Sequence, residues 1–132
     1  MPDRLSGAAV VIRGGSTATV ARLDQAFEDH FVAAQERSDL VAGYCLSVNA
    51  TGSETLLTVA ITARRPNGSV CPSTVEAIEN AGFVVRPTPG KWERDGHCDV
   101  HLQAGPESKP SPDDLVRLSQ AFGAAVPNPH RR

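Results

Sequence analysis

The sequence contains few aromatic residues and almost no net charge, and both shortages restrict what the protein can do. Phenylalanine, tyrosine and tryptophan make up 5% of the 132 residues, so the core must be built mainly from valine, leucine, isoleucine and alanine. The formal net charge is −2 at pH 7, without the positive excess that drives binding to nucleic acids and acidic membranes. A local basic patch can still exist, so nucleic acid is a possible but disfavoured partner.

Long apolar runs and closely paired cysteines are missing as well. No run approaches the ~18 apolar residues of a membrane span, and residues 1–4 do not resemble the start of a signal peptide. The three cysteines, Cys45, Cys71 and Cys98, form no C-x-x-C pair. We therefore expect a cytoplasmic protein without a membrane partner, whose cysteines are reduced thiols, at least two of them packed as small apolar side chains.

The length and composition predict a single globular domain spanning residues 1–132. The hydrophobic fraction of 40% and the charged fraction of 21% are typical of such a domain. At this length the chain can bury a core without disulfides or a structural metal ion. Proline and serine in residues 105–112 predict a linker. The prolines in residues 124–132 predict an irregular C-terminal tail.

Helical periodicity is clearest near the N-terminus. Apolar side chains recur at helical spacing over residues 18–37, and Ser16 or Thr17 is placed to cap that helix. A capping box, Ser73 with Glu76 three residues later, predicts a second, shorter helix.

Apolar runs and alternating patterns predict the strands, and a third helix follows the linker. That helix would be capped by Ser111 or Asp113. The expected strands span residues 8–12, 40–48, 83–86 and 98–102.

Residues 53–63 fit two structures. Ser53 and Glu54 resemble the start of a helix with one apolar stripe. The same residues are rich in β-branched side chains, and residues 49–52 would make a natural hairpin turn after the preceding strand. The pattern slightly favours a strand and leaves the helix open. Together, these elements predict an α+β fold: a mostly antiparallel sheet of four or five strands, with about three helices packed on one face.

The first candidate site is the glycine turn Gly14, Gly15, Ser16 and Thr17, between an expected strand and an expected helix. The backbone N–H groups at a helix start can hold a phosphate or carboxylate, with Arg13 supplying charge. The residues match neither a P-loop nor a dinucleotide-binding glycine pattern. An ordinary structural turn is therefore the favoured interpretation.

The second candidate site is the alternating segment around Asp99. His97, Asp99 and His101 would share one face of a strand, while Cys98 would point to the other face, into the core. Two imidazoles and a carboxylate on one face can act as an acid–base pair or bind a divalent metal. A solvated polar face is the more common explanation, and we expect no metal site and no cofactor.

The third candidate site is a hairpin tip that carries Trp92, with Arg86 and Arg94 nearby. Tryptophan and arginine are favoured in protein interfaces, and an aromatic ring beside cations can also stack on a nucleic-acid base. Plain exposure of the tryptophan is more common than either. The sequence favours a protein contact over a nucleic-acid contact at this tip.

Short segments along the chain resemble a group of small actinobacterial proteins. The resemblance is carried by residues 11–15, 74–75, 81–83, 121–123 and 127–129. These motifs have no chemical content, so the resemblance assigns no activity and no catalytic residue. It implies a compact cytosolic bacterial domain, encoded beside a partner gene.

These observations predict a small cytosolic bacterial binding or interaction module, one half of a two-gene system, with a protein partner. The alternative is a small metal-independent nuclease or phosphate-ester hydrolase that uses His97, His101 and Arg13, with Asp99 as a further catalytic candidate. This enzyme would require the arginine, the glycine turn and the histidines to meet in one cleft.

Overall fold

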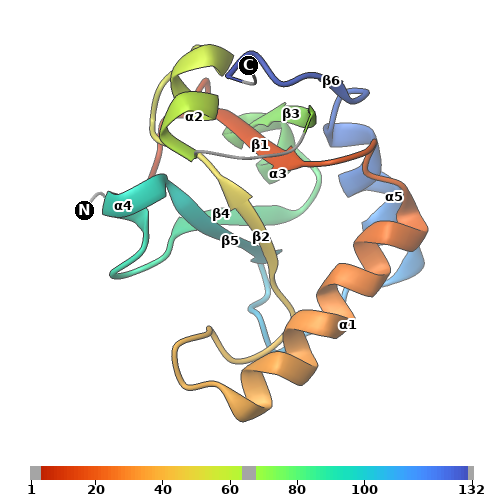
Figure 1. The fold of residues 1–132 in the computed structure, drawn as a ribbon. Coiled ribbons are helices and arrows are strands. Elements are labelled where there is room, and N and C mark those ends of the chain that lie inside the picture. The colour runs from red at the N-terminus through yellow and green to blue at the C-terminus, as the bar shows by residue number, and fades with distance from the viewer. Residues whose placement is uncertain (1–3, 64–67, 131–132) are drawn as a thin grey trace.

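The computed structural model describes residues 4–63 and 68–130, which form one sheet of six strands and five helices (Figure 1). This arrangement confirms the predicted α+β class with an antiparallel sheet. The elements, in chain order, are β1 (Val10–Gly14), α1 (Val20–Glu36), β2 (Leu46–Asn49), α2 (Leu56–Ala63), β3 (Ser69–Thr74), α3 (Val75–Asn80), β4 (Phe83–Pro87), α4 (Trp92–Asp95), β5 (His97–Leu102), α5 (Pro112–Ala121) and β6 (Val126–Pro127).

All strand pairs are antiparallel, and the strand order is β4-β5-β2-β1-β3-β6. The pairing along β1 is unequal. Strand β1 pairs with β3 at five successive residues, but with β2 only where Ile12 lies opposite Asn49. Beyond that residue β1 and β2 diverge, and α1 runs across the open side of the fork (Figure 1).

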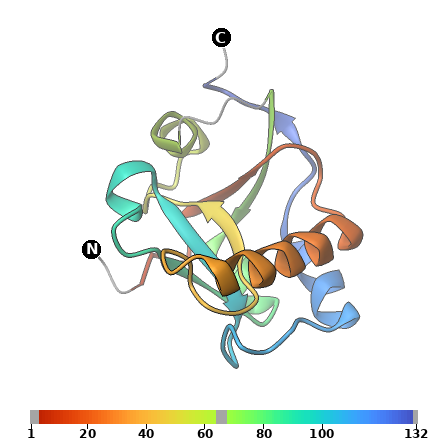
Figure 2. The ribbon, with the colours of Figure 1, turned by 60° about the horizontal axis from the view of Figure 1, so that its bottom comes forward.

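Helices pack on both faces of the sheet, which corrects the expectation that they would share one face. Helices α1, α3 and α5 contribute to the main core, together with Val11. Helix α2 covers a second, smaller core around Ile12 on the other side of β1 (Figure 2). Val11 and Ile12 are both fully buried although adjacent strand residues point to opposite faces, because β1 is covered on both sides.

Residues 53–63 contain a helix, so the slight preference for a strand is wrong. The hydroxyl of Ser53 accepts a hydrogen bond from the N–H of Thr55, and α2 follows. A hairpin with β2 does not form, because β2 lies between β5 on one side and β1 on the other. As a helix, the segment places Val59 and Ala60 on the second core.

Two helices begin slightly later than their sequence signals predict. Helix α1 is capped by Thr19, whose hydroxyl accepts a hydrogen bond from the N–H of Arg22, and not by Ser16 or Thr17. Helix α3 is capped by Thr74. The predicted cap Ser73 instead lies in β3.

The start of α5 is predicted correctly, and β2 is shorter than expected. Ser111 caps α5 and forms a capping box with Asp114, in the order typical of such boxes. Strand β2 spans Leu46–Asn49, so it begins six residues after the start of the predicted range 40–48 and ends one residue beyond it. Strands β3 and β6 were not predicted, since each contains a proline and few apolar residues. The tail expected at residues 124–132 thus includes an edge strand paired with β3.

Candidate functional site

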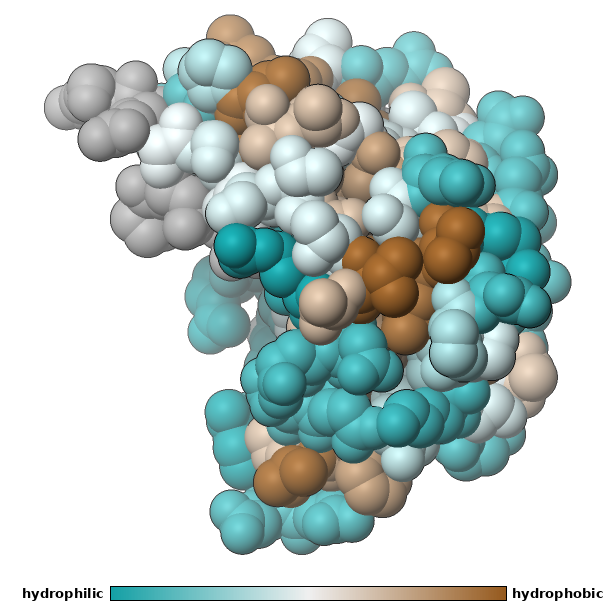
Figure 3. Space-filling model, turned by 90° about the vertical axis from the view of Figure 1, so that its right-hand side faces the viewer, coloured by the Kyte–Doolittle hydropathy of each residue, from teal (hydrophilic) through white to brown (hydrophobic). Residues whose placement is uncertain are grey.

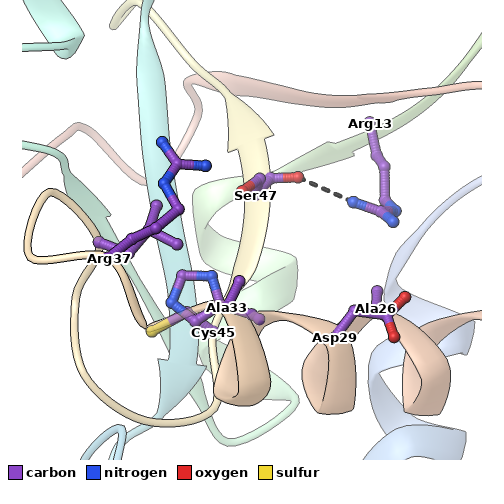
Figure 4. Close-up of a pocket in the computed structure, with 9 residues that line it drawn as sticks. Arg13, Ala26, Asp29, Ala33, Arg37, Cys45 and Ser47 are labelled. Carbon is purple, nitrogen blue, oxygen red and sulfur yellow. Dashed lines mark hydrogen bonds between the residues drawn. The ribbon is translucent and has the colours of Figure 1, made fainter. Parts of the chain in front are cut away.

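One hollow of the described structure lies where β1 and β2 diverge beneath α1, and we call it the fork cleft (Figure 4). Its volume is about 370 Å³, within the range of small-molecule sites. The residues that line it are Arg13, Ala26, Asp29, His30, Ala33, Arg37, Leu40, Cys45 and Ser47. They come from β1, from one stripe of α1 and the loop after it, and from the chain around the start of β2.

Arg13 crosses the fork at its open end. Its Nη1 atom donates a hydrogen bond to the backbone oxygen of Ser47 at 3.0 Å, where β1 and β2 are too far apart to pair (Figure 4). The arginine is half-buried. The hydrogen bond fixes the direction of the guanidinium group and places a positive charge at the wall of the cleft.

Arg37 adds a second cation, and its charge is shared with a neighbouring acid. The guanidinium of Arg37 forms an ion pair with Asp39 at 2.6 Å. This contact raises the pKa of Arg37 and lowers the pKa of Asp39, first through the side-chain hydrogen bond. Asp29 contributes an exposed carboxylate to the same lining.

Three potential metal ligands or proton carriers meet beside the cleft. His30 of α1, Cys45 before β2 and Asp99 of β5 place one nitrogen, one sulfur and one oxygen atom within 4.8 Å of one another. Cys45 and Asp99 are buried, and His30 is half-buried. Burial, followed by the charge of Asp99, raises the pKa of the Cys45 thiol to about 12. At neutral pH this cysteine is therefore a thiol and a poor nucleophile.

Hydrogen bonds fix the orientation of His30 and Asp99. The Nε2 atom of His30 lies 2.8 Å from the backbone oxygen of Val41. A carbonyl only accepts, so Nε2 carries a hydrogen and Nδ1 holds the lone pair of the neutral ring. The hydroxyl of Thr88 donates to Oδ2 of Asp99 at 2.7 Å, and Nδ1 of His97 lies 2.7 Å from the same hydroxyl oxygen. Since the hydroxyl has one hydrogen, His97 is the donor in that contact.

The strand register of the second candidate site is confirmed, but its exposure is not. His97, Asp99 and His101 share one face of β5, and Cys98 lies on the opposite face in the main core. Asp99 and His101 are only 4% and 7% exposed, so the expectation of a solvated face is wrong for them. The sequence of β5 could not reveal this cover, since Cys45 and His30 belong to other elements. All three cysteines are buried and reduced, as predicted.

The structure does not assemble the predicted hydrolytic group. Arg13 lines the fork cleft, and Asp99 reaches its neighbourhood through His30 and Cys45. His97 instead contacts Thr88, and Nδ1 of His101 lies 2.7 Å from the backbone oxygen of Leu102. Neither of these histidines lines the cleft. The sequence analysis assigned no site role to His30 or Cys45. The only signal for His30 was a helical stripe of residues 26, 30, 33 and 37, and Cys45 had no local signal.

The glycine turn is tied to β3 and to the C-terminal segment. The N–H of Gly15 donates to the backbone oxygen of Ser69, and the hydroxyl of Ser69 donates to the oxygen of Gly15, each at 3.0 Å. The hydroxyl of Thr17 accepts a hydrogen bond from the N–H of Ala125. Because α1 begins at Val20, the turn does not form the helix start that a phosphate cradle needs.

The predicted hairpin tip contains the short helix α4, which corrects the expectation of a projecting ring. Trp92 packs against the main core, and its Nε1 atom donates a hydrogen bond to the backbone oxygen of Ala50 at 2.8 Å. Arg94 lies 3.9 Å from the carboxylate of Asp95, and Arg86 is an exposed residue of β4.

No protein-family model, curated protein or solved structure matches this chain. The resemblance to actinobacterial proteins therefore stays a prediction. None of the helices in the described part of the chain combines the length and the apolar character needed to cross a membrane.

Proposed function

We propose that the protein is a small binding module that takes an anionic molecule, with one carboxylate or phosphate group, in the fork cleft. The observation that carries this proposal is the guanidinium of Arg13, held at the wall of the cleft by the backbone of Ser47. An arginine that is already oriented loses little side-chain entropy when it binds an oxyanion, and its planar group matches carboxylate and phosphate oxygens.

The acidic groups at the cleft offset part of its positive charge, and this limits how much negative charge the ligand can carry. Arg37 adds a cation, but Asp39 offsets it and Asp29 adds a carboxylate to the lining. His30 supplies a polar ring beside them. This balance favours a molecule with one anionic group over a polyanion such as nucleic acid.

Binding receives more support than hydrolysis. A hydrolase needs an activated nucleophile or a base that faces the substrate. The thiol of Cys45 has a pKa of about 12, and burial is the main cause. The alternative of a metal-independent nuclease or phosphate-ester hydrolase relied on His97 and His101, which lie outside the cleft lining.

A contact surface built on Trp92, Arg86 and Arg94 also receives less support, because the indole packs inward.

Figure 3 shows the side that carries α1 and α5, where hydrophobic surface forms a small cluster among hydrophilic groups. Large interfaces usually have broader apolar patches.

The proposed compartment is the cytoplasm, which is consistent with three buried, reduced cysteines.

The test is isothermal titration calorimetry with inorganic phosphate and with acetate, at low salt. We expect at least one of these anions to bind the wild-type protein, and Arg13→Gln to lower its affinity at least tenfold. Arg86→Gln is the matched control, since it removes an exposed arginine outside the fork cleft and should bind as the wild type does. Equal affinity in the wild type and Arg13→Gln, or no binding of either anion, would refute the proposal.

A further inference from the structure

We infer that His30, Cys45 and Asp99 form a binding site for a divalent transition-metal ion, with zinc as the best fit, beside the fork cleft. The sequence alone predicted no metal. The inference goes beyond anion binding and does not depend on it, because it rests on a different set of atoms. Those atoms are one nitrogen, one sulfur and one carboxylate oxygen within 4.8 Å of one another.

The donor set and its spacing suit zinc. Zinc takes histidine nitrogen, cysteine sulfur and carboxylate oxygen at ~2.0–2.3 Å in tetrahedral geometry, which puts neighbouring ligand atoms roughly 3.3–3.8 Å apart. Ligand atoms that already lie within 4.8 Å reach this spacing through small side-chain movements. The mixture of one soft and two harder donors excludes calcium and magnesium, which prefer oxygen ligands alone.

The groups behind the ligands are arranged as metal sites require. A histidine ligand usually donates its second N–H to a carbonyl or carboxylate, which fixes the ring and directs the other nitrogen at the metal. Nε2 of His30 lies 2.8 Å from the oxygen of Val41 in this way, which leaves the Nδ1 lone pair as the donor. The carboxylate of Asp99 is held by the hydroxyl of Thr88 through Oδ2, and keeps Oδ1 as a possible ligand.

The burial of the Asp99 carboxylate favours the binding of a cation beside it. A carboxylate that is 4% exposed is costly unless positive charge compensates it. Within the described residues, Asp99 forms no ion pair with an arginine, lysine or histidine. On binding, the metal ion forms a bond to the sulfur of Cys45, and the thiol proton leaves to solvent.

Three protein ligands leave one tetrahedral position open. His30 and Cys45 both line the fork cleft, so a metal ion that they hold can be reached from it. Water fills the fourth position in the simplest case. If the proposed anion binds in the cleft, its oxygen can take that position, and this last step alone rests on the proposed function.

The test is titration of the full-length, reduced, metal-free protein with cobalt(II), followed by competition with zinc. We expect thiolate-to-cobalt charge-transfer absorption and the visible bands of a tetrahedral ion, both removed by stoichiometric zinc. Zinc at a hundredfold excess over its Kd should raise the Tm by roughly 10 °C. Cys45→Ala should abolish the charge-transfer band, and His30→Gln and Asp99→Asn should each weaken zinc binding at least tenfold.

Cys71→Ala is the matched control, because Cys71 is also a buried thiol but donates its hydrogen to the oxygen of Gly123. It should keep the full cobalt spectrum. If Cys45→Ala does not fold, as judged by circular dichroism, the zinc affinities of His30→Gln and Asp99→Asn decide. The inference fails if the wild type shows neither the cobalt bands nor a zinc-dependent Tm, or if unchanged bands persist in Cys45→Ala.

The anion titrations distinguish failure of the metal site from failure of the proposed anion site. Arg13→Gln should lose phosphate or acetate binding and retain the cobalt spectrum, since Arg13 is not among the metal ligands. Loss of the cobalt spectrum in Arg13→Gln would show that the two sites are not independent, and would overturn the assignment of three ligands.

Discussion

The two long edges of β1 differ in how they are closed. On one edge, β3 pairs with β1 at five residues, and the glycine turn continues this contact through Gly15 and Ser69. On the other edge, β2 pairs only at Ile12, and the gap beyond is bridged by the side chain of Arg13. Backbone hydrogen bonds leave no room for a ligand on the first edge, whereas side chains leave a cleft on the second.

This difference explains why the most conspicuous motif is not the best candidate site. The glycine turn belongs to the closed edge, where the N–H and the backbone oxygen of Gly15 already form hydrogen bonds with Ser69. On the open edge, the backbones of β1 and β2 are not paired beyond Ile12, and polar side chains fill the gap and line the fork cleft. In this protein the fork cleft is therefore a better candidate site than the glycine turn.

The largest expected effect comes from the one residue that joins both edges. Ile12→Ala should lower the free energy of unfolding by about 2–5 kcal/mol, because Ile12 is fully buried beneath α2. Urea denaturation measures this change, and hydrogen exchange should show α2 opening first. Ile61→Ala is the control: Ile61 is 47% exposed on the same helix, and its loss should change stability by only about 0.5 kcal/mol. Equal losses from both variants would contradict the packing described for α2.

A smaller effect distinguishes the two edges directly. Ser69→Ala removes the hydroxyl that donates to Gly15, and should cost about 0.5–1.5 kcal/mol of stability without changing anion affinity. Ser47→Ala on the open edge is the matched change. Arg13 bonds the backbone oxygen of Ser47, which the substitution keeps, so stability should stay near that of the wild type. Urea denaturation and calorimetry of both variants would sharpen the contrast, and a loss of anion binding in Ser69→Ala would reverse it.

The smallest expected effect is the pH dependence contributed by the buried thiol beside the cleft in the metal-free protein. The pKa of Cys45 is about 12 in the folded protein, against 9.0 for an ordinary thiol. Between these values the unfolded chain has lost the proton that the folded chain retains, so stability falls as the pH rises above 9. Urea denaturation at pH 8 and pH 10 should show this loss, and Cys45→Ala should reduce it. An identical loss in Cys45→Ala would assign it to other groups, such as Cys98, whose pKa is also about 12.

Local sequence signals predicted those elements whose patterns do not depend on distant partners. The apolar spacing of α1, the cap residue of α5 and the alternation in β5 are such signals, and each corresponds to an observed element. The signals failed where neighbours decide the outcome. Residues 53–63 have strand-like composition but form a helix, because β2 lies between β5 and β1 in the sheet and no further strand can be added beside it.

The amino-acid sequence by itself determined the α+β class, the burial of the cysteines and the face on which Asp99 lies, because composition and period-two alternation are local properties. Only the tertiary structure decided that β1 and β2 meet at one residue, and that α1 covers the resulting fork. It also brought His30, Cys45 and Asp99 together from three separate parts of the chain. Such convergence depends on strand order and packing, which no local pattern in this sequence encodes.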